Sequence, residues 1–362
     1  FWLKPYFFPA LVLGSRQRAS NCRMPLLAFV ADASSPNGKG LLDLLKELEG
    51  RAPYIIGNDF VAFESSGQLA EVEVIVIVVF AGGSPAMMKE MWPHCPKVKW
   101  VHSMAAGVDT VCPVLNALPR GLEIPLTNAK GAFSRSLAEY AVGAMLHFNK
   151  QVPRLQQQRT GRKWEKFIMA ELHGKTVGFI GFGDIAQATA RLCKAFGMTI
   201  MALRNTPGAS GSDLADDVVY ASEAKDGGAK LEVFQRSDFV VCTLPGGPAT
   251  KDACGRAEFS AMKPTGVFIS MGRGTCVDEA ALIDVLQARA IAGAALDVFA
   301  VEPLPADSPL WDCNNLLMSP HNADLTEDYM RLTWDVFLQR LTEYCDPGFT
   351  TFSGTVDKTK GY

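Results

Sequence analysis

The stretch VGFIGFGDIAQATARLCKAFG, from Val177 to Gly197, decides the fold of this chain. An apolar run ends at Gly181 and Gly183, and a helical pattern of apolar residues begins directly after them. With Ala186 the two glycines complete the pattern G-x-G-x-x-G/A, which joins a strand to a helix in dinucleotide-binding domains. Gly181 permits the sharp turn, Gly183 lets the backbone approach a pyrophosphate, and Ala186 allows close packing of helix on strand. The alternative is a glycine-rich turn with a structural role only.

A phosphate bound at this turn would meet the free backbone N–H groups of the helix and the positive end of its dipole. Asp184 lies inside the turn and adds a negative charge, which opposes an anion there. We expect the cofactor to lie along a short run of residues, namely Gly181, Phe182, Gly183, Asp184 and Ile185.

The end of the next apolar run predicts which dinucleotide binds. Domains that prefer NAD carry an acidic residue about 20 residues after the glycines, where it accepts hydrogen bonds from the ribose 2′-hydroxyl. This chain has Arg204, Asn205 and Thr206 there, and its next acid is Asp213. A guanidinium and neutral donors suit a 2′-phosphate instead. We therefore predict NADP as the cofactor, with NAD as the second choice. The alternative is an exposed arginine without a ligand.

Composition limits the remaining classes of function. The chain has 362 residues, of which 48% are hydrophobic, and a formal net charge of -3. This length predicts about two domains, and the charge excludes the basic surface typical of nucleic-acid binding. No apolar run approaches the roughly 18–20 residues of a transmembrane helix. The nine cysteines form no C-x-x-C pair, which argues against a metal site or a disulfide framework and favours a reducing, cytoplasmic compartment.

The first 23 residues differ in composition from the rest. They contain no acidic residue and carry Lys4, Arg16, Arg18 and Arg23, a composition typical of targeting segments. A genuine transit segment would direct the protein to a plastid or mitochondrion. A leader-like artefact, such as a misread upstream start, would leave the cytoplasmic prediction unchanged. In either case we expect residues 1–23 to be disordered and outside the folded domains.

Strands and helices alternate along the chain, which predicts parallel βαβ units. A first series begins at Leu26, a second begins at Gly174, and a final helical pattern runs from Glu327 to Tyr344. We predict an α/β fold of two Rossmann-like or flavodoxin-like domains with parallel sheets, the nucleotide-binding domain being inserted in the substrate domain. The predicted bounds are 24–125 with 326–346 for the substrate domain, 126–325 for the NAD(P)-binding Rossmann domain, and 347–362 for a mobile tail.

Polar residues follow apolar strands in the second series. Arg273 ends FISMGR, Glu302 lies a few residues after LDVF, and His321 ends MSPH. In open α/β sheets ligands bind beyond the carboxyl ends of the strands, so these side chains could meet in one crevice. Singly, each has a plain structural explanation: a surface arginine, a capping acid and a satisfied loop histidine.

Seven motifs follow one another in the order HSMAAGVD, SRSLAEY, GFIGFGDIAQ, CTLPGGPATKD, SMGRGTCVDEAAL, GAALDVFAVEPLP and SPHNAD. From about Met24 to Tyr344 the chain resembles the D-isomer-specific 2-hydroxyacid dehydrogenases, and within them the glyoxylate/hydroxypyruvate reductase branch. The resemblance implies a reductase that transfers hydride from NADPH to a small 2-oxo acid. It also implies a homodimer formed through the nucleotide-binding domain.

The same resemblance implies a role for each candidate residue. It makes Arg273 the partner of the substrate carboxylate and carbonyl oxygen, His321 the general acid, and Glu302 the carboxylate that orients His321. The backbone of Ala106 and Gly107 would hold the substrate carboxylate. The remaining cofactor-binding residues that it implies are Leu244, Pro245, Thr250, Met271, Gly272 and Asp297, the last of which would bind the nicotinamide carboxamide.

Other functions share these features. A D-lactate, phosphoglycerate or formate dehydrogenase would carry similar motifs, and corepressors on the same fold bind a dinucleotide and act through partners. Asn322 and Asp324 stand where small residues are common in the family, so the shape of the pocket, and with it the substrate acid, departs from the family pattern. Turnover that requires His321 would separate an enzyme from a binding protein.

Overall fold

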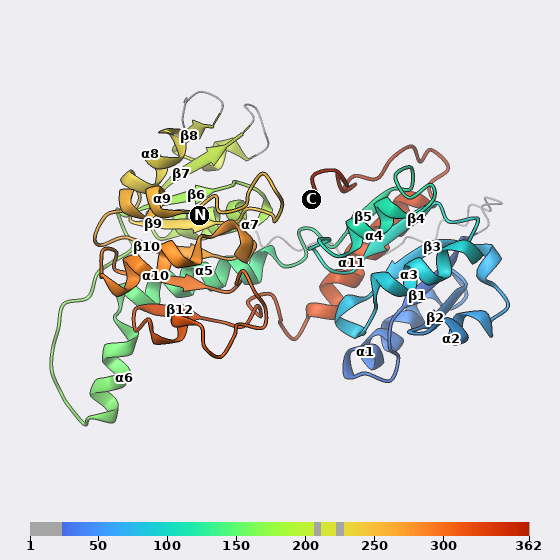
Figure 1. Ribbon diagram of the computed structural model, residues 1–362, viewed down its shortest axis with the longest axis horizontal. Coiled ribbons are helices and arrows are strands. Elements are labelled where there is room, and N and C mark those ends of the chain that lie inside the picture. The colour runs from blue at the N-terminus through green and yellow to red at the C-terminus, as the bar shows by residue number, and fades with distance from the viewer. Residues whose placement is uncertain (1–23, 206–210, 222–227, 362) are drawn as a thin grey trace, which may run out of the picture.

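The computed structural model describes residues 24–205, 211–221 and 228–361 of the chain. Two α/β domains lie side by side, one with a five-stranded and one with a seven-stranded sheet, and the paired strands of both sheets are parallel (Figure 1). The predicted fold class is thereby confirmed. The predictions made for residues 1–23 and for Thr206 fall outside the described residues.

The first domain is built on a sheet with the flavodoxin-like strand order 2-1-3-4-5. In spatial order its strands are β2 (Tyr54–Gly57), β1 (Leu26–Val30), β3 (Val72–Ile77), β4 (Trp100–Ser103) and β5 (Leu126–Asn128). Helices α1 (Pro36–Leu45) and α11 (Tyr329–Tyr344) pack on one face. The other face is covered by α2 (Phe60–Glu64), α3 (Pro85–Met91) and α4 (Val111–Ala117). The strands read as apolar runs because both faces of the sheet are buried.

The second domain has the Rossmann order, with the direction of winding reversing beside β6. Its strands are, in spatial order, β12 (Leu316–Met318), β11 (Gly293–Leu296), β10 (Val267–Ser270), β9 (Phe239–Cys242), β6 (Thr176–Ile180), β7 (Thr199–Arg204) and β8 (Asp217–Tyr220). Helices α5 (Ser134–Asn149) and α7 (Asp184–Ala195) cover one face. The other face is covered by α8 (Gly228–Arg236), α9 (Arg256–Ala261) and α10 (Glu279–Gln287).

Short 3₁₀ helices complete the connections between these elements. They are η1 (Lys46–Leu48), η2 (Leu69–Glu71), η3 (Val79–Ala81), η4 (Trp92–His94), η5 (Ser212–Leu214), η7 (Gly274–Cys276) and η8 (Pro309–Asp312). The stretch 154–173, predicted as a surface connection, contains most of a further helix, α6 (Val152–Thr160), which buries none of its residues.

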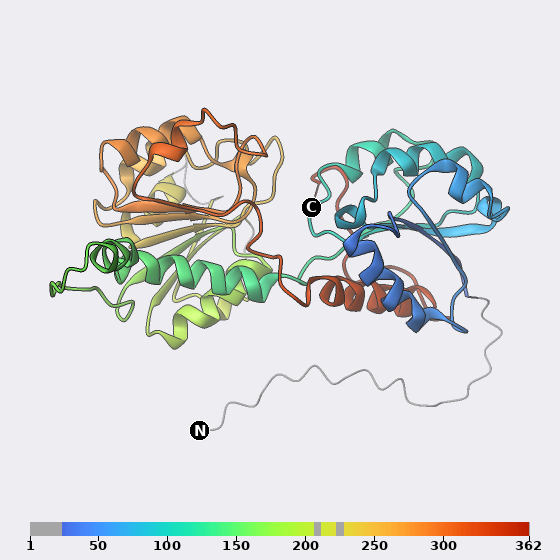
Figure 2. The same ribbon diagram turned by 90° about the horizontal axis from the view of Figure 1, so that it is seen from below.

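The chain crosses between the domains twice (Figure 2). It leaves the first domain before α5 and returns to it as α11, whose Trp334 and Phe337 are fully buried there. The predicted boundary at residue 125 is wrong, because β5 pairs with β4 and completes the first sheet. A strand of three residues is too short to show a period in the sequence.

Residues 347–361, predicted as a mobile tail, pack against the first domain instead. The ring of Phe352 lies 4.8 Å from that of Trp100, and its side chain is 5% exposed. Val356 donates its N–H to the carbonyl of Leu126 at 2.8 Å. Two apolar residues within this polar stretch, Phe352 and Val356, are buried there, a signal that composition alone conceals.

No helix among the described residues is long and apolar enough to cross a membrane. The described cysteines are free thiols, and all of them except Cys345 are buried. Within the same residues, no group of three or more His, Cys, Asp or Glu side chains could hold a metal ion.

Candidate active site

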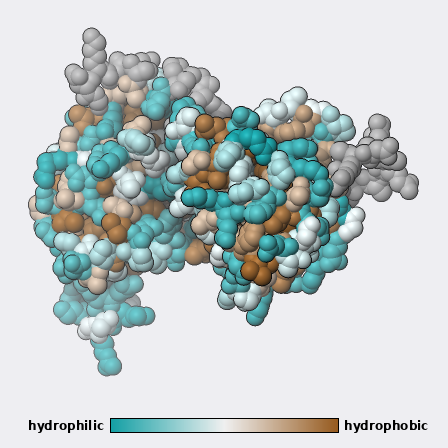
Figure 3. Space-filling model, turned by 45° about the vertical axis from the view of Figure 1, so that its right-hand side comes forward, coloured by the Kyte–Doolittle hydropathy of each residue, from teal (hydrophilic) through white to brown (hydrophobic). Residues whose placement is uncertain are grey.

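A cleft of about 1390 Å³ lies between the two domains, which Figure 3 shows as two lobes. Residues that follow β4 and β5 in the first domain line it on one side, and residues that follow β6, β7, β9, β10, β11 and β12 line it on the other. Among the described candidate residues, all but Glu302 line this cleft, namely Ala106, Gly107, Gly181, Phe182, Gly183, Asp184, Ile185, Arg204, Asn205, Leu244, Pro245, Thr250, Met271, Gly272, Arg273, Asp297 and His321.

The turn between β6 and α7 is shaped to receive an anion. Gly181 has φ +84°, a left-handed conformation that favours glycine, and a Cβ there would approach Leu244 to 3.0 Å. Gly183 is the N-cap of α7 and supplies no side-chain cap, so the first N–H groups of the helix keep their donor capacity. A Cβ on Gly183 would project into open space, since the nearest atoms of other residues are more than 4 Å away. These features fit a dinucleotide pyrophosphate at this turn.

The negative charge of Asp184 in this turn has a counterpart in the first domain. Lys130, which follows β5, places its ammonium 3.7 Å from the Asp184 carboxylate. Both side chains line the cleft, and that of Lys130 is 71% exposed. The lysine therefore reduces the repulsion that Asp184 would exert on a bound phosphate, at the modest strength expected of exposed charges.

Arg204 lies at the end of β7, beside the glycine turn. Its residue is 8% exposed, and one guanidinium nitrogen donates to the carbonyl of Phe182 at 3.0 Å. The guanidinium carbon lies 5.3 Å from the centre of the Phe182 ring, within the range of a cation–π contact. The cation is thus held against the turn where the cofactor phosphates are expected, with Asn205 next to it on the cleft wall.

The loop after β9 is held tightly under the cleft. Thr250 donates its hydroxyl to the carbonyl of Pro245 at 2.7 Å, which closes the loop on itself. Gly272 packs against the same loop, because a Cβ there would come within 2.2 Å of the Leu244 carbonyl oxygen. Met271, before this glycine, is 3% exposed. The loop predicted to contact the cofactor is therefore held by the Thr250 side chain and by close backbone packing.

His321 and Glu302 form a pair. Nδ1 of His321 lies 2.7 Å from Oε2 of Glu302, and the two side chains are 40% and 34% exposed. The other oxygen of Glu302 accepts the N–H of Phe299 at 2.8 Å. Because the carboxylate engages Nδ1, Nε2 is the ring nitrogen left for a ligand in the cleft. Glu302 does not line the cleft itself and acts on it through His321.

Asp297 holds the turn that carries His321. The backbone of His321 has φ +50°, a conformation that costs a non-glycine residue about 1–2 kcal/mol. The Asp297 carboxylate accepts the Ser319 hydroxyl at 2.6 Å and the N–H groups of Asn322 and Ala323 at 3.0 and 3.1 Å. The His321 N–H in turn bonds the Asp297 carbonyl at 2.8 Å. These bonds offset the strain and fix the imidazole at the mouth of β11 and β12.

Arg273 reaches across the cleft to the first domain. Its Nε donates to Oδ2 of Asp109 at 3.0 Å, and its NH1 donates to the carbonyl of Gly272 at 2.9 Å. Its NH2 occupies the space beside Gly107, where a Cβ would lie only 1.7 Å from it. A glycine at position 107 thus lets the Arg273 guanidinium come close and leaves the backbone of this loop uncovered by a side chain. Asn128 donates to the carbonyl of Ala106 at 2.5 Å and steadies the same loop.

Several residues of the site were not predicted from the sequence. Asp109 lies inside the motif HSMAAGVD, and Ser319 lies inside SPHNAD, yet only the fold pairs them with Arg273 and Asp297. Asp324 lines the cleft near His321, and burial raises its pKa above the usual range for an aspartate. Lys130 carried no signal beyond its charge. The sequence marked Asp324 only as an unusual residue, without a role.

The site combines three capacities within one cleft: an anion-binding helix start, a guanidinium facing a glycine loop, and an imidazole paired with a carboxylate. The first can hold a dinucleotide, the second a small carboxylate, and the third can deliver a proton. An acid with a reducible carbonyl group beside its carboxylate would use all three.

Comparison with known proteins gives consistent matches. Residues 142–323 match the model of the family "D-isomer specific 2-hydroxyacid dehydrogenase, NAD binding domain". A glyoxylate reductase of Thermococcus gammatolerans is 33% identical over 244 residues, which cover 66% of this chain and 70% of the relative. A D-3-phosphoglycerate dehydrogenase of Methanocaldococcus jannaschii is 28% identical over 306 residues, covering 83% of this chain and 55% of the relative. The chain spans about half the length of its phosphoglycerate dehydrogenase relatives.

Solved structures share the two-domain architecture. An NADPH-dependent glyoxylate/hydroxypyruvate reductase of Sinorhizobium meliloti, in complex with NADP and malonate, is 25% identical and superposes with a TM-score of 0.67. The match covers 93% of this chain and 98% of that one. The similarity therefore extends over both domains and the cleft between them.

Proposed function

The chain belongs to the D-isomer-specific 2-hydroxyacid dehydrogenase family, and we propose that it catalyses the NADPH-dependent reduction of small 2-oxo acids, glyoxylate and hydroxypyruvate foremost. The observation that carries the proposal is one cleft lined by a proton donor, a carboxylate-binding guanidinium and an anion-binding helix start. The glyoxylate reductase among the relatives supports this substrate class, and the S. meliloti structure with NADP supports the cofactor.

The residues of the cleft divide the chemistry among them. When bound, the reduced nicotinamide supplies the hydride for the carbonyl carbon. Arg273, aligned by Asp109, binds the substrate carboxylate and steadies the oxygen that gains negative charge. His321 gives this oxygen a proton from Nε2, while Glu302 holds the imidazole in place. The loop at Ala106 and Gly107 closes the carboxylate end of the site.

The preference for NADPH rests on the end of β7. Arg204 places a guanidinium there, and the next residue is the uncharged Asn205. An acid would accept hydrogen bonds from a 2′-hydroxyl and repel a 2′-phosphate, whereas a guanidinium attracts the phosphate.

The test is the consumption of NADPH or NADH by the purified protein with glyoxylate or hydroxypyruvate, followed by the ultraviolet absorbance of the cofactor. We expect turnover with NADPH, and a loss of about 10²- to 10⁴-fold in kcat for His321→Ala, since the general acid is removed. The matched control is His94→Ala, because His94 is exposed, packs on Phe60 and does not line the cleft. A clear preference for NADH would contradict the assignment of Arg204. Tight cofactor binding without turnover would favour a corepressor-like binding protein.

A second candidate function, oxidation of D-3-phosphoglycerate, is favoured by the relatives of that name. The same assay separates the two, with D-3-phosphoglycerate and its 2-oxo product added to the substrate set. A kcat/KM for the phosphorylated acid that exceeds those for glyoxylate and hydroxypyruvate would favour the second function.

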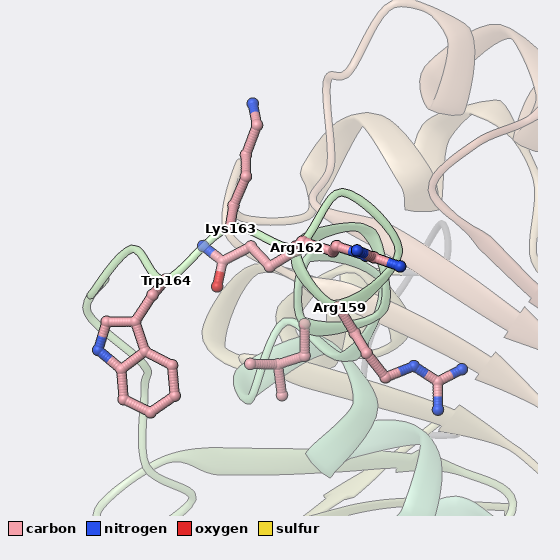
Figure 4. Close-up of a pocket in the computed structure, with 6 residues that line it drawn as sticks. Arg159, Arg162, Lys163 and Trp164 are labelled. Carbon is pink, nitrogen blue, oxygen red and sulfur yellow. The ribbon is translucent and has the colours of Figure 1, made fainter.

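The protein is further proposed to act as a homodimer through the arm formed by α6 and the loop that follows it. The arm exposes two large apolar side chains, Trp164 at 95% and Ile168 at 90%, an arrangement typical of interaction surfaces. Figure 4 shows the tip of the arm, where the side chains of Trp164 and Arg159 point away from each other. We expect light scattering to give a dimer, and the double variant Trp164→Ser, Ile168→Ser to give a monomer. A monomeric wild type would contradict this part of the proposal.

A further inference from the structure

The segment Thr351–Gly361, here called the strap, follows α11 and has no role in the chemistry described above. It lies along the same cleft as the candidate catalytic residues. The strap residues that line the cleft are Thr351, Phe352, Ser353, Gly354, Thr355, Val356 and Gly361. A segment of the first domain thus forms part of the cleft wall.

The strap is joined to the edge of the first sheet. Thr355 forms an isolated antiparallel bridge with Thr127 of β5, and Val356 donates its N–H to the carbonyl of Leu126 at 2.8 Å. This pairing satisfies part of an edge strand that would otherwise expose its backbone. The next residue of β5, Asn128, bonds the carbonyl of Ala106. The strap therefore sits one strand away from the loop that is proposed to hold the substrate carboxylate.

Lys358 anchors the second half of the strap. Its ammonium donates to the carbonyl oxygens of Gly121, Leu122 and Ile124 at 2.6, 2.8 and 2.6 Å, which uses all three of its donors. Asn116 of α4 donates to the Lys358 carbonyl at 3.0 Å. Burial lowers the pKa of Lys358, in agreement with an ammonium enclosed by backbone. The strap is thus held to the first domain by a cluster of bonds around one side chain.

The end of the strap reaches the second domain. The carbonyl oxygen of Lys360 lies 3.6 Å from the position that a Cβ on Gly247 would take, in the loop after β9. The preceding glycine, Gly246, lies against the pair proposed to bind the acid: a Cβ there would be 3.0 Å from Oδ1 of Asp109 and 3.2 Å from Cγ of Arg273. The end of the strap therefore lies near Gly247, the residue after the glycine that packs against Asp109 and Arg273.

We propose that the strap is the wall of the acid-binding end of the cleft and sets the length of the 2-oxo acid that fits there. The inference rests on the proposed function and names its substrate class more closely: acids with short side chains. The wall is backbone that Lys358 holds to the first domain, and the Lys360 carbonyl lies near Gly247 of the second. It gives way to a longer side chain only when these bonds are released.

The test compares Lys358→Met with wild type. Methionine keeps much of the length of the lysine side chain but removes the three hydrogen bonds. Lys97→Met is the matched control, because Lys97 is an exposed lysine of the same domain that pairs only with the surface residue Glu71 in the described structure. The readouts are kcat/KM for glyoxylate and for 2-oxohexanoate with NADPH, and amide hydrogen exchange of the strap.

We expect Lys358→Met to speed amide exchange in the strap and to shift the ratio of kcat/KM toward 2-oxohexanoate by about tenfold or more, the size of effect that a change in pocket length produces. Faster exchange with an unchanged ratio would overturn the inference. A wild type that reduces no 2-oxo acid would overturn the proposed function, and the strap inference with it. An active wild type whose variant keeps the ratio overturns the strap inference alone.

A second variant keeps the inference testable if Lys358→Met does not fold. Asn116→Ala removes one bond to the strap, and the Asn116 Oδ1 is buried without a partner among the described residues, so its loss costs little stability. We expect a smaller shift in the same direction. A shift toward glyoxylate in this variant would overturn the inference.

Discussion

In each sheet the first strand along the chain turns into a helix at the point where the sheet reverses its winding, yet only one of these two turns is open. After β6 the helix starts at Gly183 with no side-chain cap. After β1 the helix starts at Ser35, whose hydroxyl accepts the N–H of Gly38 at 3.0 Å and donates to the carbonyl of Asp32 at 2.8 Å. The first-domain turn is therefore closed by its own groups.

Contacts from other loops complete this closure. The N–H of Asp32 donates to the carbonyl of Ala81, and Asn37 donates to the carbonyl of Phe80 at 2.8 Å. Flavodoxin-like sheets offer a ligand site at this position, but here the chain fills it. The difference shows that a strand, a turn and a helix do not by themselves make a phosphate site. What decides is whether the helix N–H groups are already used.

The histidines of the two domains differ in the same way. His321 is paired with Glu302 at the cleft, whereas His102 of β4 is fully buried. The Thr127 hydroxyl accepts the Trp100 indole N–H at 2.8 Å and lies 2.7 Å from Nδ1 of His102. Since that hydroxyl has one proton to give, it donates to Nδ1 and keeps the ring neutral. His102 is thus bonded within its own domain, whereas His321 lines the cleft.

The largest expected effect is on the closed turn. A Cβ on Gly38 would lie 1.8 Å from the backbone oxygen of Asp32, and neither atom can move without opening the turn. Gly38→Ala should therefore lower the free energy of unfolding by about 3 kcal/mol or more, above the usual range for overpacking. Urea unfolding followed by tryptophan fluorescence measures this. Unchanged stability would mean that the turn is less closed than its contacts indicate.

The open turn should respond in the opposite way. Gly183→Val places a side chain in free space, so we expect little change in the free energy of unfolding. The same side chain would fill the position of the pyrophosphate and remove two or more charge-assisted hydrogen bonds, which weakens NADPH binding by about 100-fold or more. Titration of NADPH fluorescence gives the affinity. If Gly183→Val bound NADPH normally, the cofactor would lie elsewhere in the cleft.

The buried histidine predicts a loss of stability in acid. Burial, with a smaller contribution from Arg340, lowers the pKa of His102 to about 3, while the unfolded chain keeps a value near 6.5. Below 6.5 the unfolded state binds a proton that the folded state refuses, so stability falls with decreasing pH by about 1.4 kcal/mol per unit. Urea unfolding at about pH 7 and about pH 5 should show this slope in wild type, by about 2 kcal/mol in total, and less of it in His102→Gln. Equal slopes would contradict the neutral buried ring.

Much of the fold could be predicted from the sequence, because long apolar runs and glycine turns determine the structure of their own residues. The turn at Gly181 and Gly183 and the alternation of strands and helices predicted two parallel α/β domains, and the layout with its closing helical pattern predicted that one is inserted in the other. The boundary at residue 125 failed because β5 is a strand only through its pairing with β4. The tail failed for the same reason: its polar composition conceals two side chains that pack on distant residues.

The candidate site followed from motifs rather than from patterns of charge. Candidate residues from the ends of seven strands line one cleft, as the motifs implied, but the sequence could not supply their partners. Asp109, which holds Arg273, is 164 residues away from it in the chain. Asp297 was expected to face the cofactor, and in the structure its carboxylate also holds the turn of His321. Interactions between distant residues are visible only once the fold brings them together.

A smaller effect on cofactor affinity is expected from a change at Arg204. This change tests whether the open turn selects NADPH over NADH. Arg204→Ser should weaken NADPH binding by about tenfold and leave NADH binding nearly unchanged, because only the 2′-phosphate uses the guanidinium charge. The measurement is the ratio of the two dissociation constants in wild type and variant. Equal losses for both cofactors would instead assign Arg204 to the support of Phe182, whose carbonyl it bonds.

The smallest effect concerns Lys130 and Asp184, which span the two domains at the mouth of the open turn. Lys130→Met should weaken NADPH binding by about two- to threefold, and Asp184→Asn should strengthen it by a similar factor, because exposed charges interact by less than about 1 kcal/mol. The double variant should bind nearly as wild type does, and raised salt should reduce all these differences. Titrations at low and high ionic strength measure them. If both single variants weakened binding, the ion pair would act by holding the two domains together. The first domain would then affect NADPH binding through the shape of the open turn and not through the charge of Lys130.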